Sequence, residues 1–251
     1  MSRTISFMLA LCAFALPVGA SVDNEIAALF VSANQAYDRG EFEDARKLYL
    51  EICGKSPSSI EAWYNAANAA FRNGATGEAI LYYRRAWFLN PRDADVLANL
   101  QLAIQRTGAR IPVDSILDNA ATELSQAGWK RLFQAGYWLS FVLAIPLILV
   151  PAARRFIQPW LILTLLMACA GLAGWLYWQQ WSKLEESVVV SGRQVARYEP
   201  REQATEYFAL PEGSIVYGEE AFDQWVKVRA GDQSGWVLAS AIRQVNTWQA
   251  P

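Results

Sequence analysis

Residues 61–91 have the sequence "EAWYNAANAAFRNGATGEAILYYRRAWFLNP", rich in alanine and aromatic residues. This stretch repeats an earlier one, because a shift of 34 residues aligns positions 26–59 with positions 60–93. The identical pairs are Ile26/Ile60, Ala28/Ala62, Ala33/Ala67, Asn34/Asn68, Ala36/Ala70, Gly40/Gly74, Ala45/Ala79, Tyr49/Tyr83 and Pro57/Pro91. The glycine of each copy is suited to end a first helix, and the proline to stop a second one. The sequence therefore predicts two copies of a helical hairpin.

The period of this repeat is that of the tetratricopeptide (TPR) family, whose units are helix pairs of 34 residues. The chain resembles that family in its paired alanines, which let helices approach closely, and in Tyr49 and Tyr83, which fill the space between them. A third segment, "ADVLANLQLAIQRTG", repeats the first helix alone and is suited to cover the open end of the stack. We therefore predict an all-α TPR region with a capping helix at residues 26–106.

The TPR resemblance also implies a concave groove, lined by the first helices, that binds a peptide or a partner helix. By position, the groove residues are Phe30, Asn34, Tyr37, Asp38, Tyr64, Asn68, Phe71 and Arg72, with Leu102 and Gln105 on the capping helix. Asn34 and Asn65 resemble two members of the clamp with which some TPR proteins hold a C-terminal carboxylate. Phe30 and Asp95 stand where that clamp has lysines, so a carboxylate would meet a negative charge. We therefore interpret Asn34 and Asn68 as ordinary polar groove residues.

The N-terminus has the composition of an export signal. Arg3 gives a positive start, residues 5–16 are apolar but too short to cross a bilayer, and residues 18–20 have the small-residue pattern that signal peptidase accepts. We expect a signal peptide at residues 1–20 with cleavage after Ala20. The residue before Cys12 is leucine, so a lipid anchor is not expected. Whether cleaved or kept as an anchor, this segment would send the TPR region across the membrane.

Two later stretches predict membrane-spanning helices. Residues 132–151 and 157–178 contain no charged side chain, and each has roughly the 20 residues that a bilayer requires. Tryptophan and tyrosine near their ends fit the aromatic belts of membrane interfaces. Because neither stretch contains an ionisable side chain suited to a transport path, we interpret both as anchors.

The short loop at residues 152–156 contains Arg154 and Arg155 and decides the expected topology. By count alone, more Lys and Arg residues flank the other ends of the spans, which would place this loop outside. The first hydrophobic segment usually dominates orientation, however, and here it is the export signal. We therefore expect a cytoplasmic loop, with both soluble regions on the periplasmic side of a bacterial inner (cytoplasmic) membrane.

Residues 107–131 form an amphipathic linker, with apolar residues at helical spacing behind a cap at Asp114. The pattern allows this segment to lie along the membrane surface or to pack against the last repeat, and does not choose between them.

Beyond Glu186 the pattern changes to short alternating runs with turn signals at residues 211–213 and 231–232, as in a small all-β domain. The ending "DQWVKVRAGDQSGWVLASAIRQV" resembles bacterial SH3-like domains, whose last strands have Trp-x-Lys-Val followed by Gly-Trp-Val. We expect an SH3-like barrel at residues 186–245. Its first half departs from the family, because "ARYEPREQA" replaces the usual Asn-Val-Arg-x-Gly-Pro stretch.

Alternation within this module turns Val226 and Val228 inward and leaves Trp225 and Lys227 on the other face. These two residues form the expected ligand face of the barrel. Trp225 is suited equally to contact a ligand and to pack on the domain surface.

The composition argues against several classes of function. Of 251 residues, 53% are hydrophobic and 18% are charged, with 22 Lys and Arg against 24 Asp and Glu and no long basic run, so nucleic-acid binding is not expected. Histidine is absent from the sequence, which removes the commonest general base and zinc ligand. Cys12, Cys53 and Cys169 are too scattered for a disulfide framework or a CxxC metal site. We expect no enzyme activity, metal or cofactor.

The order of these parts resembles the E-type membrane protein of Bat (aerotolerance) operons, over nearly the whole mature chain. The resemblance implies a non-catalytic scaffold that works beside A-domain membrane proteins and a MoxR-type ATPase, in envelope stress tolerance or complex assembly. An alternative of another class is a cell-wall (peptidoglycan)-binding anchor or receptor, in which the SH3-like module holds peptidoglycan. The expected fold class is a multidomain membrane protein with TPR repeats, two transmembrane helices and a small all-β barrel.

Overall fold

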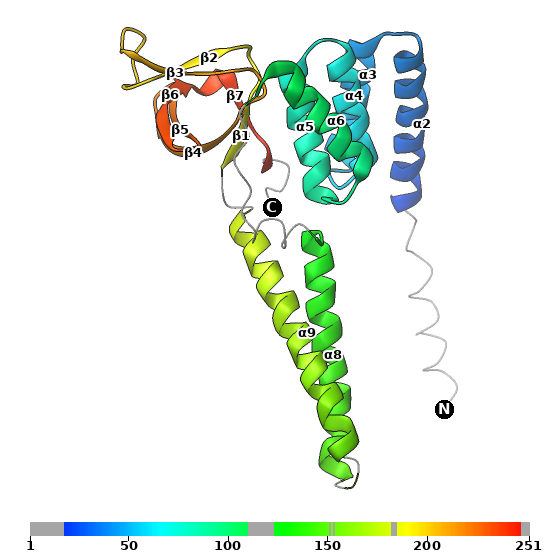
Figure 1. The fold of residues 1–251 in the computed structure, drawn as a ribbon. Helices are drawn as coiled ribbons and strands as arrows, with labels where there is room; N and C mark the ends of the chain where they lie inside the picture. The colour runs from blue at the N-terminus through cyan, green and yellow to red at the C-terminus, as the bar shows by residue number, and fades with distance from the viewer. Residues whose placement is uncertain (1–17, 110–122, 151, 153, 182–184, 247–251) are drawn as a thin grey trace, which may run out of the picture.

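The computed structural model describes residues 18–109, 123–150, 152, 154–181 and 185–246. Along the chain these residues form a helical region, a long pair of helices and an antiparallel sheet domain (Figure 1). The helical region and the sheet domain lie side by side at one end of the helix pair (Figure 1). The other end of the helix pair points away from both regions.

The helical region follows the predicted repeat. It contains α2 (Val18–Asp38), α3 (Phe42–Lys55), α4 (Ile60–Arg72), α5 (Thr76–Leu89) and α6 (Ala94–Thr107). Gly40, Gly74 and Gly108 follow the first helices one period apart, and their φ angles of 80°, 86° and 64° suit glycine. Ser59 and Asp93, also one period apart, cap α4 and α6 by accepting backbone N–H bonds. The predicted helix-ending role of Gly40 and Gly74 is therefore confirmed.

Buried alanines make the close approach of these helices possible. Alanines at equivalent positions in the two copies have almost no exposed surface: Ala33, Ala36, Ala45, Ala67, Ala70 and Ala79. Larger side chains between the helices complete one core, which includes Tyr49, Ile52, Trp63, Ile80 and Tyr83. Helical stability here comes from packing, since the α3 and α5 starts have no side-chain cap.

The helix pair consists of α8 (Gln126–Leu149) and α9 (Arg154–Trp181), which pack along each other (Figure 1). Their backbones meet at small residues: a Cβ added to Gly136 would lie 2.6 Å from the Ala168 nitrogen, and one added to Gly171 would lie 2.4 Å from the Phe133 nitrogen. The helices are therefore held at a distance that only glycine allows.

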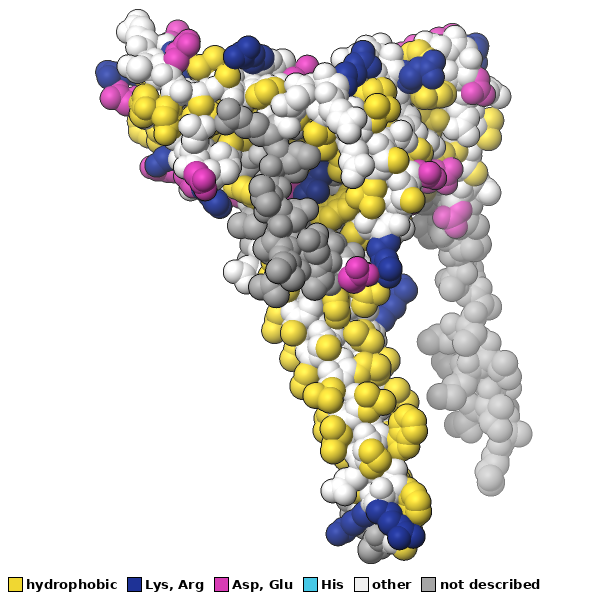
Figure 2. Space-filling view, viewed as in Figure 1, with side chains coloured by type: hydrophobic (Ala, Val, Ile, Leu, Met, Phe, Trp, Pro, Cys, Tyr) yellow, Lys and Arg dark blue, Asp and Glu magenta, His cyan; other side chains and the backbone are white. Residues whose placement is uncertain are grey.

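The outward faces of the helix pair are apolar (Figure 2). Exposed side chains include Tyr137, Trp138, Phe141, Val142, Ile145, Leu149, Phe156, Trp160, Ile162 and Leu166. Among the described residues, one helical segment, Arg154–Gln180, is long and apolar enough to cross a membrane. This segment corresponds to the predicted span at residues 157–178, whereas the predicted pair of spans is not confirmed.

The helix boundaries correct the predicted limits of the linker and the loop. The α8 helix begins at Gln126, because Ser125 accepts a hydrogen bond from the Gly128 N–H, so the end of the predicted 107–131 linker is helical. Arg154 and Arg155 open α9 instead of lying in a loop at 152–156. The Arg154 Nε donates to the Leu147 carbonyl at the end of α8, 3.4 Å away.

Other predictions fall partly outside the described residues. Residues 1–17, which hold most of the predicted signal peptide, and residues 110–122 of the linker belong to this group. The predicted cleavage point at Ala20 lies in the first turn of α2, so cleavage there requires that turn to unwind.

The sheet domain is a seven-stranded antiparallel sheet within the described residues, with strand order β3-β2-β6-β5-β4-β1-β7. The strands are β1 (Glu186–Val189), β2 (Gln194–Arg197), β3 (Glu206–Leu210), β4 (Ile215–Phe222), β5 (Trp225–Ala230), β6 (Gln233–Leu238) and β7 (Ile242–Gln244). The predicted turns are present, with positive φ at Gly213 and Gly231. The "ARYEPREQA" stretch, residues 196–204, holds the end of β2 and most of the connection from β2 to β3.

Strand β1 joins the sheet domain to the helical region, because it is buried on both faces. Val189 packs in the sheet core, whereas Val188 belongs to the core of the helices. Ile215 and Val245 also pack in the helical core. The two regions therefore share apolar contacts and form one body above the helix pair.

Candidate partner-binding groove and domain junction

The first helices are α2, α4 and α6, and contacts between α4 and α6 bring predicted groove residues of these two helices together. Asn99 Nδ2 donates to the Tyr64 hydroxyl at 2.7 Å, and the Arg106 guanidinium lies 5.0 Å from the centre of the Phe71 ring. The α2 rings of Phe30 and Tyr37 contact Tyr49 and Phe42 of α3. Phe30, Tyr37, Tyr64 and Phe71 are half-buried, which leaves part of each ring accessible. Such half-exposed aromatic rings are typical anchors for a protein partner.

Asn34 and Asn68 make the same structural hydrogen bond in both repeats. The Tyr49 hydroxyl donates to Asn34 Oδ1 and the Tyr83 hydroxyl donates to Asn68 Oδ1, each at 2.6 Å. Burial raises the pKa of Tyr49 to about 12 and raises that of Tyr83 as well, so both hydroxyls keep the proton that they donate. The amide oxygens are therefore occupied, in agreement with an ordinary groove role.

Two groove positions carry arginine next to aromatic rings. On α4, the Arg72 guanidinium lies 4.8 Å from the centre of the Phe42 ring. On α6, Arg106 has the equivalent position and is stacked on the Phe71 ring. In the first repeat this position is occupied by the exposed Asp38. Leu102 and Gln105 are exposed on α6. The groove thus becomes more basic from α2 toward α6.

The predicted ligand face of the sheet domain needs correction. Trp225 is only 5% exposed and Lys227 is half-buried, so Trp225 offers almost no surface to a ligand. Val228 is fully buried and Val226 packs against the sheet core, as alternation predicts. Alternation correctly assigns the faces here, but the side of β5 that bears Trp225 is covered.

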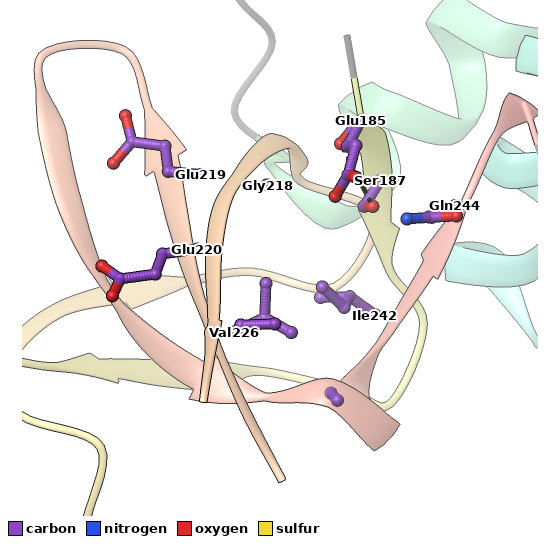
Figure 3. A pocket seen from close by; sticks show the side chains of 10 residues that line it. Glu185, Ser187, Gly218, Glu219, Glu220, Val226, Ile242 and Gln244 are labelled. Carbon is purple, nitrogen blue, oxygen red and sulfur yellow. Dashed lines mark hydrogen bonds between the residues drawn. The ribbon is translucent and has the colours of Figure 1, made fainter. Parts of the chain in front are cut away.

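A cavity of about 710 Å³ lies elsewhere on the sheet domain, between β1, β4, β5 and β7 (Figure 3). Glu185, Glu219 and Glu220 stand at its rim, and Val226 and Ile242 lie between them (Figure 3). Of these acids, Glu219 pairs with Arg229 at 3.1 Å. The cavity is acidic and therefore repels anionic groups.

The strongest polar contact between the helical region and the sheet domain joins Arg84 of α5 to Glu186 of β1. Both guanidinium contacts are short, with Nε to Oε1 at 2.8 Å and Nη2 to Oε2 at 2.9 Å. The two side chains are 13% and 5% exposed. A bidentate pair at this depth fixes both the distance and the orientation of the two elements.

Further contacts surround this pair. Arg85 Nε donates to the Val245 carbonyl at 3.1 Å, while its guanidinium lies 4.7 Å from the centre of the Trp63 ring. Burial lowers the pKa of Arg85, and the carbonyl contacts offset part of that cost. The Gly77 N–H donates to Glu212 Oε1 at 2.7 Å, so the Glu212 carboxylate lies at the start of α5.

The end of α9 also packs against α5. Trp178 is buried, with its ring centre 6.2 Å from that of Trp87 and 5.9 Å from that of Phe88. The Arg84 guanidinium lies 4.3 Å from the centre of the Trp87 ring. We define these contacts of α5 with β1 and α9 as the junction, because they connect all three parts of the molecule.

No local sequence pattern predicts the junction. A weak signal of it is Arg84-Arg85, two consecutive cations in the second helix of the second repeat. Buried cations require partners, but their identity depends on elements about a hundred residues further along the chain. Within the described residues, no three His, Cys, Asp or Glu side chains form a group that suits a metal ion.

Comparison with known proteins agrees with the helical architecture. No curated protein matches the chain. Residues 30–94 match the family model described as tetratricopeptide repeat, a stretch that covers α3, α4, α5 and the C-terminal part of α2. The chain therefore contains TPR repeats over this region, a type of structure that generally mediates protein–protein interaction.

Proposed function

We propose that this chain is a non-catalytic, membrane-anchored scaffold that binds partner proteins in its TPR groove. The observation that carries the proposal is the row of half-exposed aromatic rings on the first helices. The Asn99 hydrogen bond holds Tyr64, and ring contacts with Tyr49, Phe42 and Arg106 hold Phe30, Tyr37 and Phe71 respectively. These rings are prearranged, so binding would not require them to be ordered first.

The groove prediction concerns Tyr64 and Phe71. Replacing both by alanine removes two aromatic anchors, and each replacement is expected to cost about 2 kcal/mol of binding free energy. Proteins cross-linked to the full-length chain in cells are captured and measured by quantitative mass spectrometry. We expect the double variant to lose most of the partners that the natural chain captures.

The matched control replaces Tyr198 and Phe222, two exposed aromatic residues of the sheet domain, by alanine. This variant loses a similar ring surface outside the groove and should keep its partners. Circular dichroism first checks that both variants have the same helical signal as the natural chain. Unchanged capture by a folded Tyr64 and Phe71 variant would place the binding surface elsewhere.

The proposed membrane anchor is the whole helix pair, with α8 as a second span beside α9. Support comes from the exposed apolar side chains on both helices and from their continuous contact. Because both soluble regions lie at the same end of the pair (Figure 1), insertion of the pair puts them on one side of the membrane. We assign that side to the periplasm.

The topology prediction uses reporter enzymes in the full-length chain. Alkaline phosphatase, which is active only after export, should be active when fused after Pro251. It should be inactive when inserted at Ala152, next to the basic tip of the helix pair (Figure 2). A fluorescent protein that folds only in the cytoplasm should give the opposite pattern. Export-dependent activity from Ala152 alone would reverse the proposed orientation.

The finer proposal is that the sheet domain is SH3-like and that the chain acts in a Bat-type assembly with A-domain membrane proteins and a MoxR-type ATPase. It rests on the order of the domains and on the Trp-x-Lys-Val and Gly-Trp-Val strands, which are β5 and β6. Burial of Trp225 weakens the cell-wall alternative, because that reading used Trp225 as its ligand contact.

A further inference from the structure

A second concave site lies where the TPR region meets the sheet domain. It is a cleft of about 640 Å³ between the α4–α5 turn, the end of α6 and the β2–β3 side of the sheet domain. Thr76, Arg106 and Thr107 line it from the helices, and Arg193, Pro211 and Glu212 from the sheet domain. The cleft is distinct from the acidic cavity of Figure 3.

The charges of this cleft are not balanced. Arg106 and Arg193 are exposed, and neither forms an ion pair with a described residue. The acid in the lining, Glu212, already accepts the Gly77 N–H at 2.7 Å. The lining therefore carries two guanidinium groups and one carboxylate, which leaves an excess of positive charge.

The cleft continues the TPR groove. Arg106 lines the cleft and is also stacked on Phe71, a groove residue. Arg72, one period before Arg106, extends the same basic row into the groove. Arg72 and Arg106 lie in the last turns of α4 and α6, where a cation interacts favourably with the helix dipole. This interaction accounts for the presence of these two arginines, but it does not account for Arg193 on the other side of the cleft.

We propose that this cleft, with Arg72, Arg106 and Arg193, binds an acidic segment of a partner protein whose neighbouring residues lie in the groove. Guanidinium groups match carboxylates in geometry and form charge-assisted hydrogen bonds with them. The cleft, at about 640 Å³, is larger than a small ion requires. The acidic cavity on the same domain repels such a segment and leaves the cleft as its site. This proposal rests on the proposed scaffold function and names its partner chemistry.

The test measures binding of a fluorescein-labelled peptide of alternating glutamate and leucine to the full-length chain in detergent micelles, by fluorescence anisotropy. A second peptide has glutamine in place of glutamate. We expect the natural chain to prefer the glutamate peptide. Replacing Arg106 and Arg193 by glutamine should weaken its binding by about tenfold per arginine, because each charge-assisted contact is lost. Binding of the glutamine peptide should not change.

The control variant carries Arg201→Gln and Arg243→Gln, two exposed arginines of the sheet domain that do not line the cleft. It changes the net charge equally and should keep its preference for the glutamate peptide. Equal binding of both peptides by the natural chain, no binding of the glutamate peptide, or unchanged binding by the Arg106 and Arg193 variant would overturn the proposal. Displacement of the peptide by inorganic phosphate, but not by chloride of equal ionic strength, would assign the cleft to phosphate instead.

The two proposals fail in different ways. If cellular partners are lost from the Tyr64 and Phe71 variant but kept by the Arg106 and Arg193 variant, the groove stands and the acidic-segment proposal is wrong. If both variants keep their partners, the scaffold proposal itself is wrong.

Discussion

Replacing Arg84 by methionine is expected to lower the free energy of unfolding by about 3–5 kcal/mol, because it leaves the Glu186 carboxylate buried without its partner. The carboxylate accepts two short bonds from this one guanidinium. Arg84 also covers Trp87 and Phe88, so its loss opens the junction to water. Thermal unfolding of the full-length chain in detergent, followed by tryptophan fluorescence, measures the change.

Two further variants separate the charge effect from a general loss of packing. Arg84→Met combined with Glu186→Leu replaces the pair by apolar side chains and should recover most of the loss, since buried pairs contribute little net stability beyond such replacements. Arg229→Met removes a partner of Glu219 in a more exposed pair and should cost less than about 1 kcal/mol. Two results would contradict a desolvated ion pair. One is that Arg84→Met lowers the free energy of unfolding as little as Arg229→Met does. The other is that the Arg84→Met, Glu186→Leu double variant is less stable than Arg84→Met alone.

The repeat was predictable because each of its features is local. Helix-ending glycines, capping residues and small buried alanines recur at one period, and each acts within its own helix pair. The tyrosine pair at 49 and 83 was predicted to fill interhelical space, and both rings are buried. Their bonds to Asn34 and Asn68 also recur at this period, and each bond lies within its own repeat.

The junction was not predictable from these local patterns. Arg84 and Glu186 are separated by the entire helix pair, and their contact exists only because the sheet domain packs against α5. Strand β1 gave a weak signal, since Val188 and Val189 are consecutive apolar residues, as in a strand that is buried on both faces. Nothing in that run indicates which element covers the second face.

Strand β5 shows the corresponding limit for exposure. Alternation separates Trp225 from Val228 correctly, but it gives a face and not a depth, and both residues are buried. Strands β2 and β3 were not individually predicted, because the polar β2–β3 connection interrupts the pattern between them. The basic cleft was missed for a similar reason, since its two arginines come from regions that meet only in the folded chain.

Gly171 and Gly174 of α9 both pack against α8. A Cβ added to Gly174 would meet the Trp129 ring, and one added to Gly171 would meet the Phe133 backbone. Backbone atoms have less freedom to move than a side-chain end. Of these two glycines, Gly171 therefore tolerates substitution less.

Replacing Gly171 by leucine should separate α8 from α9. The first added carbon alone would lie 2.4 Å from the Phe133 nitrogen and 2.7 Å from its Cα, so the helices must move apart. Overpacking of this kind costs about 1–3 kcal/mol or more. The separation also weakens the hydrogen bond from the Ser140 hydroxyl to the Thr164 hydroxyl, which joins the helices at 2.9 Å. In a membrane, contacts such as these hold helices together, because lipid packs against apolar side chains as well as protein does.

Disulfide cross-linking measures this separation in membranes. Cysteines replace Ser140 and Thr164 in a chain whose natural cysteines are changed to alanine, and mild oxidation should then join α8 to α9 in high yield. A protease site inserted at Ala152 allows the chain to be cut between α8 and α9. Cross-linked fragments then stay together until the disulfide is reduced. Gly171→Leu should strongly reduce the yield, whereas Ala170→Leu, on the exposed side of α9, should leave it unchanged because the added side chain does not point at α8. Equal yields from the two leucine variants would mean that the glycine contact does not set the distance between the helices.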